Sequence, residues 1–307
     1  MATVDIKRVL RYPPEIFMGT VIKDLSEGYN DLVVYTGLDV ARLHATFMGF
    51  SSTPASNVML EVTRDGVSGY MTVFDLGAVP GLDYHNDARI PAARSIVVRA
   101  RAISSVSNFA FRYLIRASRL RIVHKLLHGI ALTPEERRIA ERLGLIDSVF
   151  AYPSDVWNPY RGITEVHYTA VTVTQSGAIL RVTPREGEKA VLIGILVERP
   201  SSPNALYIHV DRDGLDDIMV LDAYALPTIH VGYPTPFWNA MRVIAIDELV
   251  VRAEVLSGGP YKVRIVYGRA PIFLAEKIAW GLDLTERERS MAERLGLFDQ
   301  VEAGIVP

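Results

Sequence analysis

The chain contains no cysteine, and it has only two glutamines, Gln175 and Gln300. The missing thiols exclude disulfides, thiolate metal sites and a cysteine nucleophile, and they leave the redox compartment open. Scarcity of Cys and Gln is one compositional signature of thermophilic proteins. Arg outnumbers Lys 27 to 6 among the 33 basic residues, which is weaker support because a GC-rich genome has the same effect. The composition therefore favours a thermophilic source.

Short motifs for catalysis and cofactor binding are also missing. The sequence has no His-x-His pair of the kind that cupin metal sites use, and no Gly-x-Ser-x-Gly nucleophile motif. It has neither a P-loop nor a Gly-x-Gly-x-x-Gly sequence for binding phosphate. We therefore expect no catalytic, cofactor-binding or metal-ligating residues, and a protein that is not an enzyme. Paired catalytic carboxylates from distant strands leave no local motif, so an enzyme on a duplicated sandwich stays open as an alternative.

A long apolar run is absent. The longest charge-free stretch, residues 223–241, is interrupted by Pro227, Pro234 and Pro236, whereas a membrane helix needs about 20 predominantly apolar residues. Residues 1–17 mix charges with short apolar runs and lack the apolar core of a signal peptide. We expect no signal peptide and no membrane span, with a location in the cytoplasm or in a virion.

What the sequence does contain is an internal repeat. Residues 125–149 (KLLHGIALTPEERRIAERLGLIDSV) align without gaps to residues 277–301, and 14 of the 25 positions are identical. A shorter match lies upstream, where Arg64-Asp65-Gly66 corresponds to Arg212-Asp213-Gly214. Repeated segments in the same order indicate duplication of one structural unit. We predict two copies of one domain, copy one over 1–153 and copy two over 154–307, joined by a seam rich in Pro and aromatic residues.

The body of each copy has the pattern of β-strands. Residues 94–104 and 249–255 alternate small or apolar residues with charged ones, which is typical of half-buried strands. In each copy the Arg-Asp-Gly sequence follows a β-rich run, and Asp-Gly predicts a hairpin because Gly adopts the positive φ of the turn. Seven or eight such runs per copy, with turn signals at intervals of about 8–12 residues, predict an antiparallel β-sandwich resembling a jelly roll.

Each copy is expected to end in short capped helices. Thr133 and Glu136 are spaced as a capping box, and Thr285 and Glu288 repeat the device. A shorter helix is expected before each of these, around 123–128 and 274–280. The repeated Leu-Gly-Leu-x-Asp that follows is interpreted as a docking tail. The helical segment then either seals one end of its sandwich or contacts a neighbouring domain or subunit.

Three local clusters of residues partly resemble known ligand-binding patterns. His124 and His128 are spaced to share a helix face, but no zinc-protease Glu follows, so a ligand role is not expected. Residues 211–217 resemble part of a calcium loop without its closing Glu, and copy one keeps the turn but not the carboxylates, so the turn is the shared requirement. A basic stretch with aromatics has the pattern of a single-strand nucleic-acid surface, although a solvated strand edge with outward Arg is favoured. Its members are Phe109, Phe111, Arg112, Tyr113, Arg116, Arg119, Arg121 and Lys125.

Seven residues are candidate interface or ligand contacts: Trp157, Tyr160, Phe237, Trp238, Arg116, Arg119 and Arg121. The four aromatics lie among prolines, at the seam or in copy two. Aromatic side chains in such loops commonly pack against a partner domain or subunit, and exposed ones also stack on sugars.

Charge differs between the copies. Residues 1–153 hold 18 basic and 15 acidic residues, net +3, whereas residues 154–307 hold 15 and 20, net −5. Opposite charges favour head-to-tail contact between chains, which closes into rings or continues as filaments or shells. The mean hydropathy of +0.17 also suggests apolar surface buried between subunits, and an unusually large core is the alternative explanation.

We therefore predict a non-enzymatic structural protein that self-assembles through tandem β-sandwich domains, foremost a virion or capsid-type component of a thermophile. The layout is similar to that of tandem jelly-roll virion proteins in general, and the likeness is one of layout only. The partners expected are other copies of the chain and other structural proteins, and nucleic acid is not expected. A carbohydrate- or ligand-binding module is the first alternative, and an enzyme on a duplicated sandwich is the second.

Overall fold

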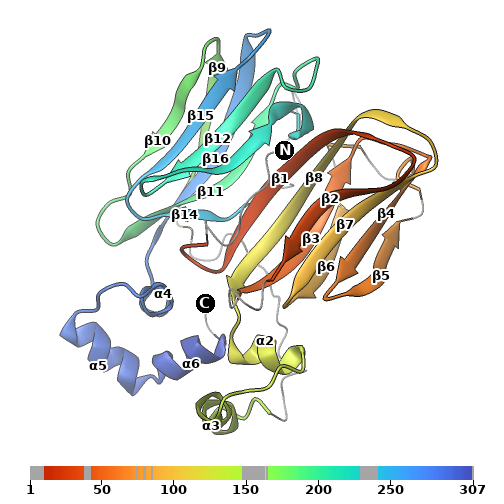
Figure 1. Ribbon diagram of the computed structural model, residues 1–307. Helices are drawn as coiled ribbons and strands as arrows, with labels where there is room; N and C mark the ends of the chain where they lie inside the picture. Colours follow the sequence, from red (N-terminus) through yellow and green to blue (C-terminus); the bar gives the residue numbers. More distant parts are fainter. Residues whose placement is uncertain are drawn as a thin grey trace.

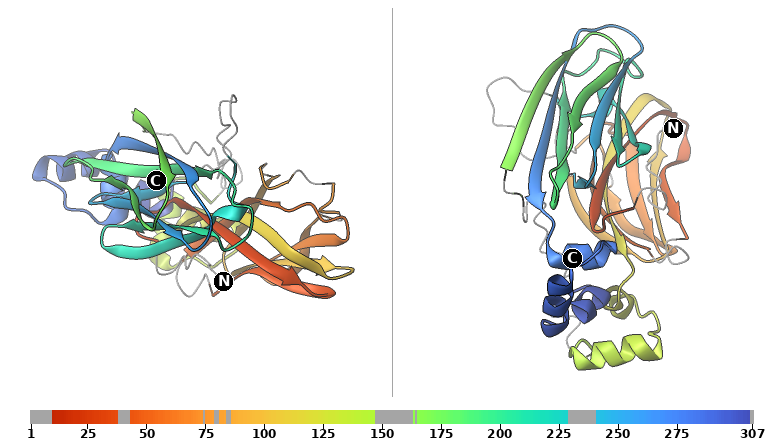
Figure 2. Two further views of the ribbon diagram at one scale, coloured as in Figure 1. Left: turned by 90° about the horizontal axis from the view of Figure 1, so that it is seen from above. Right: turned by 90° about the vertical axis from the view of Figure 1, so that its left-hand side faces the viewer.

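The computed structural model describes residues 10–37, 43–73, 75–78, 81–83, 86–146, 163, 165–228 and 241–305. The chain is mainly β, with four antiparallel sheets arranged as two sandwiches and with short helices gathered at one end (Figures 1 and 2). The predicted fold class is therefore confirmed. The predicted boundary at residue 153 lies outside the described residues, so it stays a prediction.

The first sandwich is built from two sheets of four strands. Their orders are β1-β8-β3-β6 and β2-β7-β4-β5, which is a jelly-roll arrangement of eight strands. The strands are β1 (Glu15–Leu25), β2 (Gly28–Thr36), β3 (Leu43–Ser52), β4 (Val58–Arg64), β5 (Val67–Val73), β6 (Asn86–Ala92), β7 (Ser95–Ala102) and β8 (Val106–Arg119).

The second sandwich repeats this topology strand for strand. Its sheets have the orders β9-β16-β11-β14 and β10-β15-β12-β13. The strands are β9 (Glu165–Val173), β10 (Gly177–Val182), β11 (Glu188–Val197), β12 (Leu206–Arg212), β13 (Leu215–Asp222), β14 (Val243–Ala245), β15 (Leu249–Val255) and β16 (Tyr261–Pro271). A short 3-10 helix, η2 (Ala223–Ala225), follows β13.

The register of the sheets identifies equivalent residues in the two copies. His44 on β3 lies opposite Ser118 on β8, and Lys189 on β11 lies opposite Ala270 on β16. Ser118 and Ala270 differ by 152 in number, as do the aligned residues of the helical repeat. His44 and Lys189 therefore occupy the same position in their sandwiches, although the sequence around them does not show it.

The repeated Arg-Asp-Gly forms the predicted hairpin in both copies. Asp65 and Asp213 adopt φ of 49° and 45°, followed by Gly66 and Gly214 at 83° and 77°. Each aspartate also accepts hydrogen bonds from three consecutive backbone N–H groups of a neighbouring loop, and such bonds to a charged acceptor are strong. The donors are Ala93, Arg94 and Ser95 in copy one, and Ile246, Asp247 and Glu248 in copy two. The motif recurs because it ties two loops together.

The helical ends follow the sequence prediction closely. The helices are α2 (Ile122–Leu127), α3 (Pro134–Arg142), α4 (Leu274–Trp280), α5 (Glu286–Arg294) and α6 (Leu297–Ala303). Thr133 accepts a hydrogen bond from the N–H of Glu136, and Thr285 accepts one from the N–H of Glu288. The two glutamates also pair with the repeated lysines, at 2.6 Å for Lys125 and 2.7 Å for Lys277. The identical residues of the repeat thus form identical contacts.

The docking tail of copy two forms α6, which brings the two helical segments together. Helix α6 packs against α4 and α5 and also against α2 and α3 of copy one. Arg121 pairs with Glu302 at 3.0 Å, and Arg142 pairs with Asp299 at 2.5 Å. An apolar cluster, the helix-layer core, lies beneath them and comprises Ile122, Val123, Ala140, Leu145 and Ala303. The helical segment therefore contacts the neighbouring domain, as one of the two interpretations predicted.

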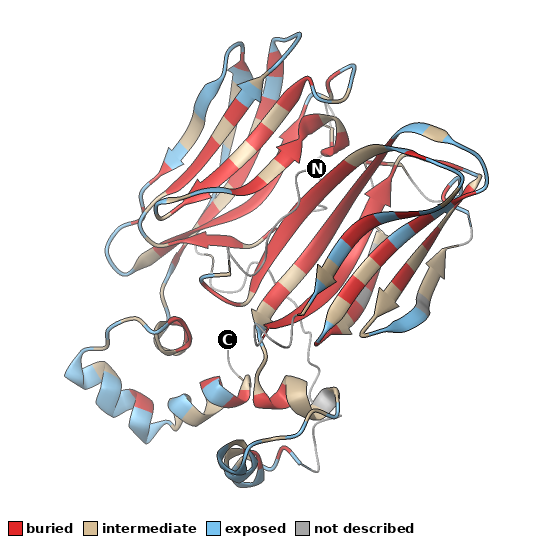
Figure 3. Cartoon of the chain, viewed as in Figure 1, coloured by how far each residue is buried: buried red, intermediate tan, exposed pale blue. Residues whose placement is uncertain are grey.

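Strand β1 joins the sandwiches. It is an edge strand of its own sheet and packs against β13 and β14 of copy two, where Ile16 exchanges two backbone hydrogen bonds with Arg242. All residues from Glu15 to Val21 are buried, and one hydrophobic core runs through both sandwiches (Figure 3). The sequence analysis did not predict β1, because a strand covered on both faces lacks alternation.

A buried ion pair crosses this interface. The side chains of Glu15 and Arg212 are fully buried, and the guanidinium donates to both carboxylate oxygens. Glu15 also accepts hydrogen bonds from the N–H groups of Tyr12 and Ile244, both at 3.1 Å. Arg212 donates to the Ile244 carbonyl at 2.7 Å, and its guanidinium lies 5.3 Å from the centre of the Tyr12 ring. Each buried charge is therefore well compensated, as burial requires.

Replacing Glu15 by alanine leaves the Arg212 charge buried without its counter-ion. Breaking a buried pair in this way costs about 3–5 kcal/mol, so we expect the free energy of unfolding to fall by about that amount in urea denaturation. The matched control is Asp31→Ala, which removes the exposed pair between Asp31 and Arg99 at 2.7 Å. Exposed pairs contribute about 1 kcal/mol or less, and equal losses in the two variants would contradict the assigned role of Glu15.

Candidate functional site

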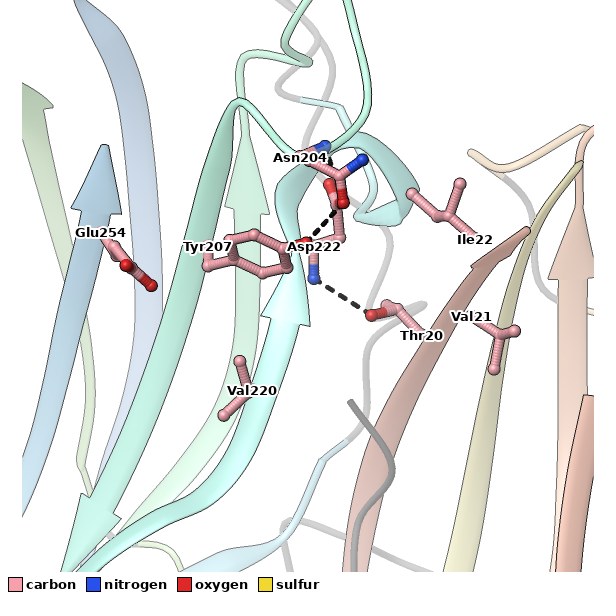
Figure 4. A pocket seen from close by; sticks show the side chains of 8 residues that line it. All are labelled: Thr20, Val21, Ile22, Asn204, Tyr207, Val220, Asp222 and Glu254. Carbon is pink, nitrogen blue, oxygen red and sulfur yellow. Dashed lines mark hydrogen bonds between the residues drawn. The ribbon is translucent and has the colours of Figure 1, made fainter. Parts of the chain in front are cut away.

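A groove lies at the junction of the two copies, between β1 and the β12–β13 hairpin (Figure 4). Its volume is about 380 Å³, within the range of small-molecule sites. The lining residues are Thr20, Val21, Ile22, Asn204, Tyr207, Val220, Asp222 and Glu254. They come from both copies, so the groove exists only because the sandwiches are held together.

Hydrogen bonds hold two polar side chains of the groove in place, those of Asp222 and Tyr207. Asp222 accepts hydrogen bonds from the N–H groups of Asn204 and Tyr224, at 2.8 and 2.9 Å, and its own N–H donates to the Thr20 hydroxyl. Burial raises the pKa of Asp222 despite these bonds. The Tyr207 hydroxyl donates to the Asn204 side chain, and burial, with the nearby carboxylates, raises the pKa of Tyr207. The groove offers an aromatic ring, an amide and carboxylates, which suits a ligand with hydroxyl groups.

A second cluster lies where α2 meets the first sandwich. His44 stacks on His124 with ring centres 4.0 Å apart and planes 6° apart, and His128 lies 5.3 Å from His44. The sequence placed His124 and His128 on one helix face but did not associate them with His44. The Nε2 atoms of His44 and His128 are buried and have no hydrogen-bond partner in the described part of the chain.

The surroundings of these imidazoles disfavour protonation. Burial lowers the pKa of all three, and brings that of His124 to about 4. Positive charges act in the same direction, and they are opposed by Asp65, 3.9 Å from His128, and by the hydrogen bond of His124 to the Arg119 carbonyl. The cations are Arg64, Arg116 and Arg121. Within the described ranges no group of three or more His, Asp or Glu has the geometry of a metal site, and stacked rings do not direct their nitrogens to one point.

Copy two has different chemistry at the same three positions. Lys189, Glu276 and Trp280 are the equivalents of His44, His124 and His128 by sheet register and by the helical repeat. Lys189 and Glu276 form a buried ion pair, and the Lys189 ammonium lies 5.3 Å from the centre of the Trp280 ring. Burial lowers the pKa of Lys189 to about 8, and Glu276 opposes this. One junction thus contains a charge pair and the other contains uncharged rings.

The seven predicted contact residues do not form one site. Arg116 is half-buried on β8, Arg119 is exposed at the end of β8, and Arg121 precedes α2 and pairs with Glu302. Trp157, Tyr160, Phe237 and Trp238 lie outside the described residues.

The interpretation of the basic stretch as a strand edge was wrong. Strand β8 lies between β1 and β3, so it is an interior strand. Arg112 is almost fully buried, and the aromatic residues Phe109, Phe111 and Tyr113 belong to the hydrophobic core. The stacking platform that the nucleic-acid interpretation needs is therefore not on the surface of this strand.

The candidate calcium loop is filled by internal contacts. Asp211 pairs with Arg252 at 2.5 and 3.0 Å and accepts a hydrogen bond from the N–H of Asp217, while Asp213 binds the neighbouring loop. Asp83, in copy one, pairs with Arg199 of copy two at 2.7 Å. These carboxylates stabilise turns and the junction of the copies.

The sequence analysis missed Glu15, His44 and the groove. Their distant partners lie between 80 and 229 positions away in the chain, and local patterns do not report such contacts. One signal was available for the ion pair, because Arg212 opens the Arg-Asp-Gly sequence that both copies share.

Comparison with known proteins gives only distant likenesses. No protein-family model and no curated protein sequence matches the chain. A structure of Sulfolobus turreted icosahedral virus aligns with a TM-score of 0.24 and 11% identity, over 82% of this chain and 60% of that chain. The CUB1-EGF-CUB2 region of human MASP-1/3 gives 0.25 and 13%, over 82% and 99%. A cupin 2 conserved barrel domain protein from Leptotrichia buccalis gives 0.19 and 6%, over 83% and 88%.

This chain thus spans 60% of the length of the virus protein chain. None of the three TM-scores exceeds 0.25, so these likenesses support no argument about function. None of the helices described, moreover, has the length and apolar character that a bilayer crossing needs.

The imidazole cluster makes the copy-one junction sensitive to acid. Below the ordinary histidine pKa of about 6.5, the unfolded chain takes up protons that the folded cluster rejects, so the free energy of unfolding falls as pH drops from about 6.5 towards 4. We expect the share of His124 to be about 2 kcal/mol, and His124→Gln to reduce the loss by that amount in urea denaturation at pH 7 and 4.5.

Hydrogen exchange provides the internal control for this prediction. On acidification α2 and α3 are expected to lose protection before α4 and α5, whose junction contains the Lys189–Glu276 pair. Parallel loss in both helical segments would contradict the role of the cluster.

Proposed function

We propose that the chain is a non-enzymatic structural protein that self-assembles through its tandem jelly-roll domains, as a virion or capsid-type component. The observation that supports this most directly is a set of three exposed apolar side chains at the end of α5 and the start of α6, termed the apolar stripe: Met291, Leu295 and Phe298. These side chains are 38%, 53% and 37% exposed. Large apolar side chains exposed close together in the chain are typical of a surface that binds another protein.

The equivalent residues of copy one provide a comparison for the apolar stripe, because there another helix partly covers them. Met291 and Leu295 are four residues apart at the end of α5 and lie on the same side of that helix, and their copy-one equivalents are Ile139 and Leu143. Both equivalents are half-buried and pack against the helix-layer core, to which α6 contributes Ala303. Two of the three stripe positions are therefore half-buried in copy one and exposed in copy two, whereas the third is exposed in both, since Ile146, the equivalent of Phe298, is 43% exposed. The occupant in copy two is proposed to be a second molecule of this chain.

The rigid connection between the sandwiches supports the same proposal. An assembly unit has to hold its contact surfaces at fixed angles, and here a shared core, a buried ion pair and α6 fix one copy on the other. The net charges of +3 and −5 in residues 1–153 and 154–307 favour contacts between unlike copies.

Light scattering after size-exclusion chromatography tests the proposal. We expect species larger than the 34.1 kDa monomer, and regular particles, tubes or rings in electron micrographs. The double substitution Met291→Glu and Leu295→Glu should shift the protein towards monomer, because it places charges in the stripe. The control is Ile103→Glu, at a side chain that is 75% exposed but outside the stripe. A monomer at every concentration, at low and at high salt, would refute self-assembly.

The groove favours a second candidate function, which is binding of a polyhydroxylated ligand such as a glycan. Tyr207 provides a ring for stacking, and Asn204 and Glu254 provide polar groups beside it. Tyr207→Ala is expected to weaken binding of a neutral oligosaccharide by about tenfold in calorimetry, the loss of one ring contact of about 1 kcal/mol or more. The control is Tyr29→Ala, which removes a tyrosine that is 58% exposed on sandwich one. Equal weakening by both substitutions would place the ligand elsewhere.

A further inference from the structure

We propose that the interface between the two copies is used a second time between molecules, so that copy two of one chain packs on copy one of the next. In this contact Glu165 faces Arg64 of the next molecule, as Glu15 faces Arg212 within the chain. The inference rests on the self-assembly proposed above and specifies its surfaces.

Both residues of the internal ion pair recur at equivalent positions. Glu15 lies opposite Ala117 in the sheet, and Glu165 lies opposite Arg269. Ala117 and Arg269 differ by 152 in number, the same difference that relates the helices, so Glu165 stands where Glu15 stands. Arg212 opens the Arg-Asp-Gly of copy two, and Arg64 opens that of copy one. The chain thus contains a second glutamate and a second arginine placed as in the internal pair.

The second glutamate lies on the surface. The Glu165 side chain is 63% exposed and contacts His167 at 3.2 Å, whereas the Glu15 side chain is fully buried. Strand β9, like β1, is an edge strand of its sheet. Copy two therefore presents outward the element that copy one uses to bind copy two.

The apolar residues of β9 agree with this use. Ile16 and Met18 of β1 are buried, at 2% and 0% exposure. Their equivalents Val166 and Tyr168 are 42% and 59% exposed. Large apolar side chains on an exposed strand edge favour association with another surface.

The surface that would receive β9 is present on copy one. Within the chain β1 packs on β13 and β14, whose equivalents in copy one are β5 and β6. Leu215 of β13 is half-buried against the shared core, and its equivalent Val67 on β5 is 58% exposed. The Arg64 side chain at the end of β4 is 26% exposed. An apolar residue and a cation therefore stand at the positions that the internal interface uses.

One difference weakens the contact between chains relative to the internal one. Pro91 lies opposite Thr46, as Ile244 lies opposite Val191, so these two residues are equivalent. Ile244 donates its N–H to Glu15, and proline has no N–H to donate. We therefore expect an association that depends on concentration. Because the two contacting surfaces differ, the contact is heterologous and produces rings or continuing assemblies.

Charge reversal tests the contact. Glu165→Arg and Arg64→Glu each place like charges in it, so each is expected to raise the concentration required for assembly by about tenfold or more in light scattering. At the concentration at which the natural chain just assembles, neither variant should assemble alone. An equimolar mixture should recover assembly, because the introduced arginine of one meets the introduced glutamate of the other and the native pair forms at alternate contacts.

The matched control is Glu198→Arg, which reverses an exposed glutamate of copy two that pairs with Lys262 at 3.6 Å. It should assemble like the natural chain.

If Arg64→Glu does not fold, the chain's lack of cysteine permits a second measurement. Glu165→Cys and Arg64→Cys variants, mixed and treated with a bismaleimide, should yield a cross-linked dimer that neither variant forms alone.

The outcomes separate this inference from the proposed function. If the natural chain assembles and both charge reversals assemble equally well, the inference is wrong and self-assembly stands. If the natural chain is monomeric at every concentration, both are wrong. Loss of assembly in each reversal with recovery in the mixture supports the contact between Glu165 and Arg64.

Discussion

The ion pair between Glu15 and Arg212 is the interaction on which the arrangement of the molecule depends. It joins the first strand of copy one to the end of β12 in copy two, and neither side chain reaches solvent. Two charges in an apolar interface are tolerated only in the geometry that pairs them, so displacement of one sandwich along the other leaves both uncompensated. The groove, the shared core and the position of α6 all require the geometry that this pair selects.

Because the chain contains two copies of one domain, equivalent residues can be compared within it. Those that form the same contacts in both copies can be separated from those that do not. The Arg-Asp-Gly turn and the Lys–Glu pair of the helical ends form identical contacts in both copies, which identifies them as requirements of the fold. The junction of sheet and helix differs completely, with His44 in one copy and Lys189 in the other. The side chains at this position differ in type although the backbone position is the same, so the fold does not require one particular residue there.

The sequence predicted the parts of the fold that depend on neighbours in the chain. Thr133 with Glu136 and Asp65 with Gly66 act within a few residues, so caps and turns followed directly from local chemistry. Strand β1 was missed because copy two covers its second face and removes the alternation that marks a strand. The order of strands placed β8 inside its sheet, which the arginines on it did not indicate. The groove arises from contact between copies, and no local pattern contains it.

The position of β1 has a consequence for the order in which the protein is made. This strand lies near the N-terminus, yet the surface that covers it belongs to residues of copy two, including Arg212 and Ile244. During synthesis from the N-terminus, copy one is complete while the binding surface for β1 is still untranslated. Until β13 and β14 leave the ribosome, a nascent chain therefore exposes an apolar strand edge with an unpaired glutamate. The duplicated architecture thus links folding of the first half to completion of the second.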